Sequence, residues 1–440
     1  MRGLKRFSFL LGLMIAMVFV LAACTGSSEE GKAEEDGEDS EQADSEEAVE
    51  IEFWTMQLKP TFTEYIEGVI TDFEEENPNI SVKWVDVPWG DMEKKILSAV
   101  ASETAPDVAN LNPQFASQLA ELDALINMDE AVSEDKKGEY FEGIWKSNSF
   151  GGKTFGIPWY LSSQVSMYNK DIFEAAGLSE EDVPSKFSEV LEVSKTIKEE
   201  TGNYAFFPSI DGSHLLETMV TMGVDLTNED MTEATFNTEE GKEAFQFFVD
   251  MYENELIPRE VLTEGHGKAV DMYQAGQLAI LASGPQFLNT VNENAPDIYE
   301  ATGVAPVITG ETNLKNVAAM NLVVPKQSDK QDAAVQFSLF MTNAENQVEF
   351  DKIVPILPSI ETALDDPYFN ELPEDPSPED RARIISAEQL KDSEVLVPPM
   401  KNYSDLQKAM TDALQAAMLG EMSVEEALAD AEEKWNAALQ

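Results

Sequence analysis

The amino-acid sequence predicts an α/β fold in which a largely parallel sheet carries helices on its faces. The prediction rests on a unit of one strand and one helix that repeats from residue 49 onward. Alternating apolar residues indicate the strands, and apolar residues spaced three and four apart indicate the helices. Strands are expected at 49–54, 80–84 and 106–111, and helices at 65–73 and 92–100. Such alternation is typical of parallel sheets, whose ligands gather at the carboxyl ends of the strands.

The rest of the chain predicts further helices and one exposed loop. Helical apolar patterns cover 245–256, 333–350 and 406–418, and Gly420 ends the last of them. Ser423 and Glu426 form a capping box that begins another helix. The Pro- and acid-rich stretch 365–380 reads as an exposed loop, and no internal repeat is apparent.

The amino terminus predicts export. Basic residues among the first six positions precede an apolar stretch over 7–21, which is too short for a comfortable membrane span. Residues 1–23 are therefore expected to be a signal peptide. Leu21 to Cys24 resembles the lipobox at which bacteria attach diacylglycerol to a cysteine and cleave before it, so Cys24 is expected to be lipidated. The alternative is an incidental cysteine in an uncleaved anchor.

An acidic stretch follows the expected lipidation site. Between residues 25 and 50 the chain has 12 acidic residues and one Lys, with hardly an apolar side chain to bury. Such a composition cannot offset the entropy of ordering. Residues 24–48 are therefore predicted to be a disordered tether, extended by the repulsion between its carboxylates.

Charge and residue usage exclude several classes of function. A formal charge of −55 excludes nucleic acid as a partner, and it is also what a surface suited to a saline or alkaline habitat would show. Beyond the signal peptide only Arg259, Arg381 and Arg383 could supply bidentate guanidinium contacts to an anion. The ligand is therefore expected to be neutral, or else cationic. One cysteine allows no intramolecular disulfide, two histidines exclude a histidine-rich metal site, and no cofactor is predicted.

Six segments together resemble a known family, the extracellular solute-binding proteins of the maltose-binding type, called family 1. They occur in the expected order at 51–62, 73–84, 105–112, 152–178, 276–287 and 420–435. The most specific of them ends in YNKDIFEAAGL. The resemblance covers nearly the whole chain after the tether.

The resemblance implies a two-lobed fold of the type II periplasmic-binding-protein class, with a hinge and a central ligand cleft. It further implies that a carbohydrate is captured between the lobes and delivered to the permease of an ABC transporter by a protein that is not an enzyme. A monomer suits that role. Lobe one is expected at 49–160 plus 304–352, and lobe two at 161–303 plus 353–440.

Sugar chemistry indicates which side chains to seek in the first lobe. A pyranose has apolar C–H faces that stack on aromatic rings and hydroxyls that need amide or carboxylate partners. After the first strand Gln57 and Lys59 occupy the expected position, and after the third strand Asn112 and Gln114 do. Each of these could instead cap a helix or face solvent.

The crossing between the lobes supplies aromatic candidates. Trp159, Tyr160 and Ser162 follow Pro158, which should interrupt sheet pairing where the chain crosses. We expect Trp159 to be a stacking platform on the cleft floor, and packing within the hinge is the alternative. The role of Trp89, which follows a proline, stays open.

On the second lobe the resemblance points to Gln286, where relatives often carry a stacking aromatic; glutamine departs from that pattern. His214 and Tyr403 are added as candidates from their loop positions, and Asn321 completes the set. The alternative for each is a packed polar residue.

Two other functions compete with sugar capture. A glycosidase would need two carboxyl groups fixed across a scissile bond, and composition cannot show that arrangement; G-x-S-x-G, P-loop and H-E-x-x-H motifs are absent. A binder of a polyamine or a quaternary ammonium osmolyte would use an aromatic box and cation–π attraction. The acidic surface and six tryptophans permit that reading.

Overall fold

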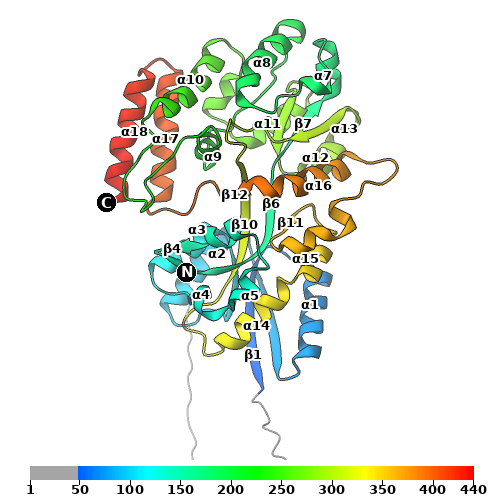
Figure 1. The fold of residues 1–440 in the computed structure, drawn as a ribbon, viewed down its shortest axis with the longest axis vertical. Coiled ribbons are helices and arrows are strands. Elements are labelled where there is room, and N and C mark those ends of the chain that lie inside the picture. Colours follow the sequence, from blue (N-terminus) through cyan, green and yellow to red (C-terminus); the bar gives the residue numbers. More distant parts are fainter. Residues whose placement is uncertain (1–47) are drawn as a thin grey trace, which may run out of the picture. The chain divides into compact units, whose positions relative to one another are not determined.

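A computed structural model describes residues 48–440 (Figure 1). The expected signal peptide, Cys24 and nearly all of the tether lie outside these residues, so the structure does not address them. Among the helices that it does describe, none is both long and apolar enough to cross a membrane.

The first of two main sheets has seven strands. Its path is β11-β6-β10-β3-β1-β2, with β12 paired to β10. The pairs β1·β2 and β1·β3 are parallel, as predicted, but β10 pairs antiparallel with both β3 and β6, so the sheet as a whole is mixed. Its strands are β1 (Val49–Met56), β2 (Ile80–Val87), β3 (Val108–Leu111), β6 (Gly156–Ser163), β10 (Lys315–Val323), β11 (Leu357–Pro358) and β12 (Ser393–Glu394).

Helices cover both faces of this sheet because its first strand is apolar on both sides. Ile51 and Phe53 of β1 join the core under one group of helices, and Trp54 and Met56 join the core under another. This is the alternation that a strand imposes on successive side chains. The first group is α1 (Thr63–Glu76) and α14 (Gln331–Met341), and the second is α2 (Trp89–Ala101) and α3 (Pro113–Glu121).

The second main sheet is antiparallel and supports a separate core. Its order is β8-β7-β9, with β7 (Val165–Asn169) between β8 (Ile280–Ser283) and β9 (Thr302–Pro306). Buried residues of these strands share one cluster with the surrounding helices and with Trp435 near the carboxyl terminus. Those helices are α7 (Lys170–Ala175), α8 (Phe187–Thr201), α9 (His214–Thr221), α10 (Glu239–Glu253), α11 (His266–Gln274), α12 (Phe287–Asn294), α13 (Pro296–Glu300), α17 (Tyr403–Met418) and α18 (Val424–Leu439).

Two long strands carry the chain between the sheets. β6 leads through Gln164 into β7, and β9 leads through residues 307–314 into β10. β6 and β10 pair along nearly their whole length, with one register shift between Met320 and Asn321 (Figure 1). Gly156 permits this contact, since a Cβ there would lie 2.9 Å from the Cβ of Asn321.

Two sequence predictions need correction. The single helix expected at 333–350 is two helices, because Asn343 caps α15 (Ala344–Asp351) by accepting a hydrogen bond from the N–H of Asn346. The loop expected at 365–380 ends early, because Ser377 and Asp380 form a capping box that begins α16 (Pro378–Gln389). Helices α17 and α18 and the Ser423 capping box are confirmed.

Short elements fill the connections. They are α4 (Met128–Ala131), α5 (Glu134–Lys137), α6 (Glu142–Ser147), β4 (Ser149–Phe150), β5 (Lys153–Thr154), and the 3-10 turns Glu180–Asp182, Arg259–Leu262, Glu361–Asp365, Pro367–Phe369 and Leu390–Asp392.

One acidic side chain is buried beside the first sheet. Asp351, at the end of α15, is fully buried, and both its carboxylate oxygens lack a hydrogen-bond partner among the described residues. Burial raises its pKa well above the usual aspartate range. The folded protein therefore keeps a proton on Asp351 at pH values where the unfolded chain releases it.

Replacing this buried carboxyl is expected to stabilise the folded protein by an amount that depends on pH. The unfolded chain releases the proton above about pH 4, so the wild type loses stability as pH rises from there toward the raised pKa, by up to about 1.4 kcal/mol per pH unit. Asp351→Asn removes that loss and should unfold at a higher temperature at pH 7 while differing little at pH 4. Calorimetry at both pH values checks this, with Asp365→Asn, an exposed neighbour, as the control. An equal effect of Asp351→Asn at both pH values would contradict it.

Candidate ligand-binding cleft

A cleft of about 530 Å³ lies between residues of the two main sheets and their helices. One wall comes from loops and strands of the seven-stranded sheet, and the other from helix starts around the three-stranded sheet. The first wall includes Trp89, Asn112, Gln114, Tyr160, Ser162, Asn316, Met320 and 354–356; the second includes Ser213, Glu217, Gln286, Tyr403 and Gln407.

Trp89 is the large exposed aromatic residue of the first wall. It begins α2 directly after β2 and leaves 47% of its surface exposed. Gln57 follows β1 with a left-handed φ of 54°. Its Oε1 accepts a hydrogen bond from the backbone N–H of Trp89 at 3.2 Å. Gln57 does not line the cleft in this structure, and its contact with the ligand stays a prediction.

Asn112 and Gln114 both line the cleft at the carboxyl end of β3. The Asn112 Oδ1 caps α3 by accepting from the N–H of Phe115 at 2.8 Å. Its Nδ2 makes no hydrogen bond within the described residues. Capping and ligand contact are therefore compatible, because the amide offers one group for each.

The side chains of β6 divide between cleft and core. Tyr160 and Ser162 line the cleft, whereas Trp159 is fully buried and stacks on Phe350 with ring centroids 5.5 Å apart. Regular alternation does not separate the two rings, because the register shift leaves Trp159 without a partner on β10 and the Tyr160 ring also lies 5.5 Å from Phe350. Trp159 differs from Tyr160 in being completely enclosed. The expectation that Trp159 is the stacking platform is therefore wrong in this structure. Burial also raises the pKa of the Tyr160 hydroxyl, which stays a neutral donor.

The second wall carries a carboxylate that the sequence did not reveal. Glu217, in α9, makes no side-chain hydrogen bond or ion pair within the described residues and faces the cleft near Tyr403. Burial, and then the charge of Glu217, raise the pKa of Tyr403 to about 12. Glu217 could have been suggested by its place one turn after His214, but no motif marks it. Among the described residues that line the cleft it is the single charged side chain.

Gln286 lies where the sequence expected it, at the start of α12 on the second wall. Its amide folds back over Gly284, where an added Cβ would meet Gln286 Oε1 at 2.3 Å. A side chain at 284 would therefore displace the Gln286 amide from its present position.

Besides Gln57 and Trp159, three further expected residues do not line the cleft. Lys59 lies with its Nζ 3.9 Å from the centre of the Trp84 ring. Asn321 is fully buried on β10, and its backbone oxygen accepts from the Asn110 side chain. His214 lines a smaller cavity behind the second wall. These outcomes reflect tertiary packing that loop position alone does not report.

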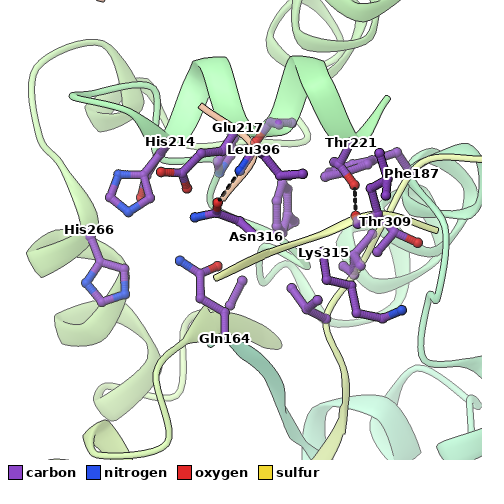
Figure 2. Close-up of a pocket in the computed structure, with 18 of the residues that line it drawn as sticks. Gln164, Phe187, His214, Glu217, Thr221, His266, Thr309, Lys315, Asn316 and Leu396 are labelled. Carbon is purple, nitrogen blue, oxygen red and sulfur yellow. Dashed lines mark hydrogen bonds between the residues drawn. The ribbon is translucent and has the colours of Figure 1, made fainter. Parts of the chain in front are cut away.

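The second cavity adjoins the cleft and has about 90 Å³ of free volume. Glu217 and Asn316 line both spaces. Figure 2 shows His214 and His266 at one end of this cavity and Thr221, Thr309 and Lys315 at the other, with Gln164 reaching in from the crossing between β6 and β7. We refer to it as the side cavity.

The cleft is suited to holding an uncharged polar molecule. Aromatic side chains, amides and hydroxyls line it, and one carboxylate is present without a basic partner. Residues 48–440 contain no group of three or more His, Cys, Asp or Glu side chains placed to hold a metal ion. The arrangement provides stacking surfaces and hydrogen bonds from two walls.

Comparison with known proteins decides the family. Residues 59–348 match the bacterial extracellular solute-binding proteins. The chain belongs to this family. Membership implies a location outside the cytoplasm and a role in binding solutes, and the described α/β architecture is that of the type II periplasmic-binding-protein class.

Relatives of this solute-binding protein include sugar binders. The crystal structure of a candidate oligosaccharide periplasmic-binding protein from Synechococcus sp. MITs9220 is 37% identical, covers 88% of this chain and 98% of its own, and superposes with a TM-score of 0.82. The sugar-binding protein MalE from Xanthomonas citri shares the fold, with a TM-score of 0.75 at 23% identity over 89% of this chain and 97% of its own. The arabinooligosaccharide-binding protein of Halalkalibacterium halodurans is 27% identical over 74% of this chain and 75% of its own.

Two tryptophans of this solute-binding protein should behave oppositely on truncation. Trp159→Ala empties a filled core site and should destabilise the fold by about 3–5 kcal/mol, whereas Trp89→Ala removes an exposed ring and should change stability by less than about 0.5 kcal/mol. Urea unfolding of the ligand-free variants measures both. A stable Trp159→Ala would return that residue to the list of cleft candidates.

Proposed function

We propose that this solute-binding protein captures a neutral oligosaccharide in the cleft and delivers it to an ABC transporter permease. The observation that carries the proposal is the lining itself, in which the exposed ring of Trp89 and the hydroxyls of Tyr160 and Tyr403 meet amides and a single carboxylate. The oligosaccharide-binding relatives support the ligand class.

The ligand contacts follow from sugar chemistry. Trp89 offers a flat apolar face for the C–H side of a pyranose ring. Asn112, Gln114 and Gln286 offer amides that both donate and accept, and Glu217 accepts from two neighbouring hydroxyls. A carboxylate without a basic partner also disfavours anionic sugars.

The mechanism that we propose is closure of two lobes around the sugar. A ligand that touches both walls binds the closed state more tightly and shifts the population toward it. We place two lobe boundaries where the chain leaves one sheet for the other, at Gln164 and within 307–314. We place the third between β11 and α16, because α16 packs against β9. The sequence-based boundary at 304 falls inside β9 and that at 352 precedes β11, which pairs with the first sheet. The released sugar then passes to the permease, and the binding protein acts as a monomer.

The anchor belongs to the same proposal. We infer that Cys24 carries a diacylglycerol group and holds the protein on the outer face of the cell membrane. Cys24→Ser should leave an exported protein that no longer fractionates with membranes after a salt wash. Retention of the variant in the membrane fraction would contradict the anchor.

Titration calorimetry tests the ligand class. Neutral oligosaccharides should bind with heat that saturates at one site, whereas betaine and spermidine should not. Saturable binding of either cation with no response to saccharides would favour the cationic-ligand alternative, in which Glu217 and the aromatic residues would form the cation site.

The stacking role of Trp89 gives a quantitative expectation. A stacked ring contributes roughly 0.5–1.5 kcal/mol beyond the area it buries, so Trp89→Ala should weaken saccharide binding at least about tenfold, or ~1.4 kcal/mol. Leu122→Ala is the matched control, because Leu122 is also an exposed apolar residue and does not line the cleft. Equal affinity of both variants would argue that the sugar does not stack on Trp89.

Sugar capture without turnover separates this proposal from the glycosidase alternative. Incubation with chromogenic glycosides should release no chromophore above the buffer rate. Release that follows protein concentration would replace the binding role by hydrolysis.

A further inference from the structure

The side cavity has an aromatic interior. Phe187, Phe206, Phe207 and Phe248 line it, and each is nearly fully buried. Its volume of about 90 Å³ has room for several water molecules, each of which takes about 30 Å³ in the liquid. An apolar interior of this size holds water poorly and suits a small organic group.

The side of the cavity nearest the cleft is polar, and most of its side chains have no hydrogen-bond partner within the described residues. The carboxylate of Glu217 and the side-chain amide of Gln164 make no hydrogen bond within the described residues, and Asn316 uses only Oδ1, which accepts from the N–H of Leu396 at 3.2 Å. Acceptors and donors thus surround an entrance that leads to phenyl rings.

Two imidazoles border the same entrance. His214 and His266 lie nearly parallel, with an interplanar angle of 10° and ring centroids 6.3 Å apart (Figure 2). Burial, and then the neighbouring His214, lower the pKa of His266. The His266 ring already hydrogen-bonds the backbone of Ala282, and His214 Nδ1 lies 3.2 Å from the Asp211 oxygen, so each ring has one nitrogen left for an uncharged polar group.

We propose that the side cavity is a subsite for the acetamido group of an N-acetylated saccharide whose sugar rings lie in the cleft. The acetamido N–H would donate to Glu217, its carbonyl oxygen would accept from the amide of Gln164 or Asn316, and its methyl group would pack against the phenyl rings. A hydroxyl at the same position would leave the phenyl rings without a partner. The inference rests on the proposed function, since it extends the ligand of the same cleft.

Matched ligands test it by calorimetry. The probes are β-1,4-linked di- and trisaccharides of glucose, N-acetylglucosamine and glucosamine, which differ at one ring position. The acetamido compounds should bind at least tenfold more tightly than the glucose compounds. Tighter binding of the free amines would replace the acetamido assignment by a cation site at Glu217, and equal affinities would overturn the subsite.

Variants locate the effect in the side cavity. Ala282→Leu fills the cavity from β8, so it should abolish the acetamido preference and change glucose affinity less than twofold. Gln164→Leu has nearly the same volume and should lower acetamido affinity alone, which keeps the test decisive if Ala282→Leu fails to fold. A loss that both ligand classes share would overturn the inference.

The same titrations distinguish a failure of the acetamido subsite from a failure of the proposed function. If none of the three series binds while another neutral oligosaccharide does, the acetamido subsite is wrong and sugar capture stands. If no neutral saccharide binds at all, the proposed function itself is wrong.

Discussion

The pairing of β6 with β10 is the constraint on which the cleft depends. These strands belong to the seven-stranded sheet, and each continues directly toward the three-stranded sheet, so their register fixes which side chains meet between the two bodies. Gly156 permits the close approach to Asn321, and the register shift beside Asn321 sets the faces of Trp159 and Tyr160. The core and the candidate site are therefore specified by the same few residues.

Local sequence signals predicted most of the elements and part of the site. The apolar periodicity that located α1, α2 and α17 reports burial directly, and the positions of Asn112 and Gln114 follow from a strand end in an α/β fold. Gln286 was indicated only by the resemblance to the family. Trp159 was misplaced because its neighbour Tyr160 fits the same composition argument, and only the tertiary packing, which buries Trp159 completely, separates them. Glu217 was missed because an acidic residue on a helix in a chain of net charge −55 carries no signal until the fold places it.

The distribution of charge bears on the uncharged ligand that we propose for this acidic protein. The acidic residues are spread over solvated faces, and eight of those described pair with lysines one helical turn away, as Glu239 does with Lys242. Pairs of this exposure contribute little to stability. The described cleft keeps one carboxylate, so its recognition rests on stacking and neutral hydrogen bonds, which salt screens weakly.

The central claim is that one ligand engages both walls of the cleft, and small-angle scattering tests it most directly. The measurement uses the mature chain carrying Cys24→Ser, with and without a saccharide that calorimetry shows to bind. We expect a smaller radius of gyration at saturation, because only a closed state lets the sugar contact Trp89 and Glu217 together. An unchanged radius of gyration at full occupancy would contradict it.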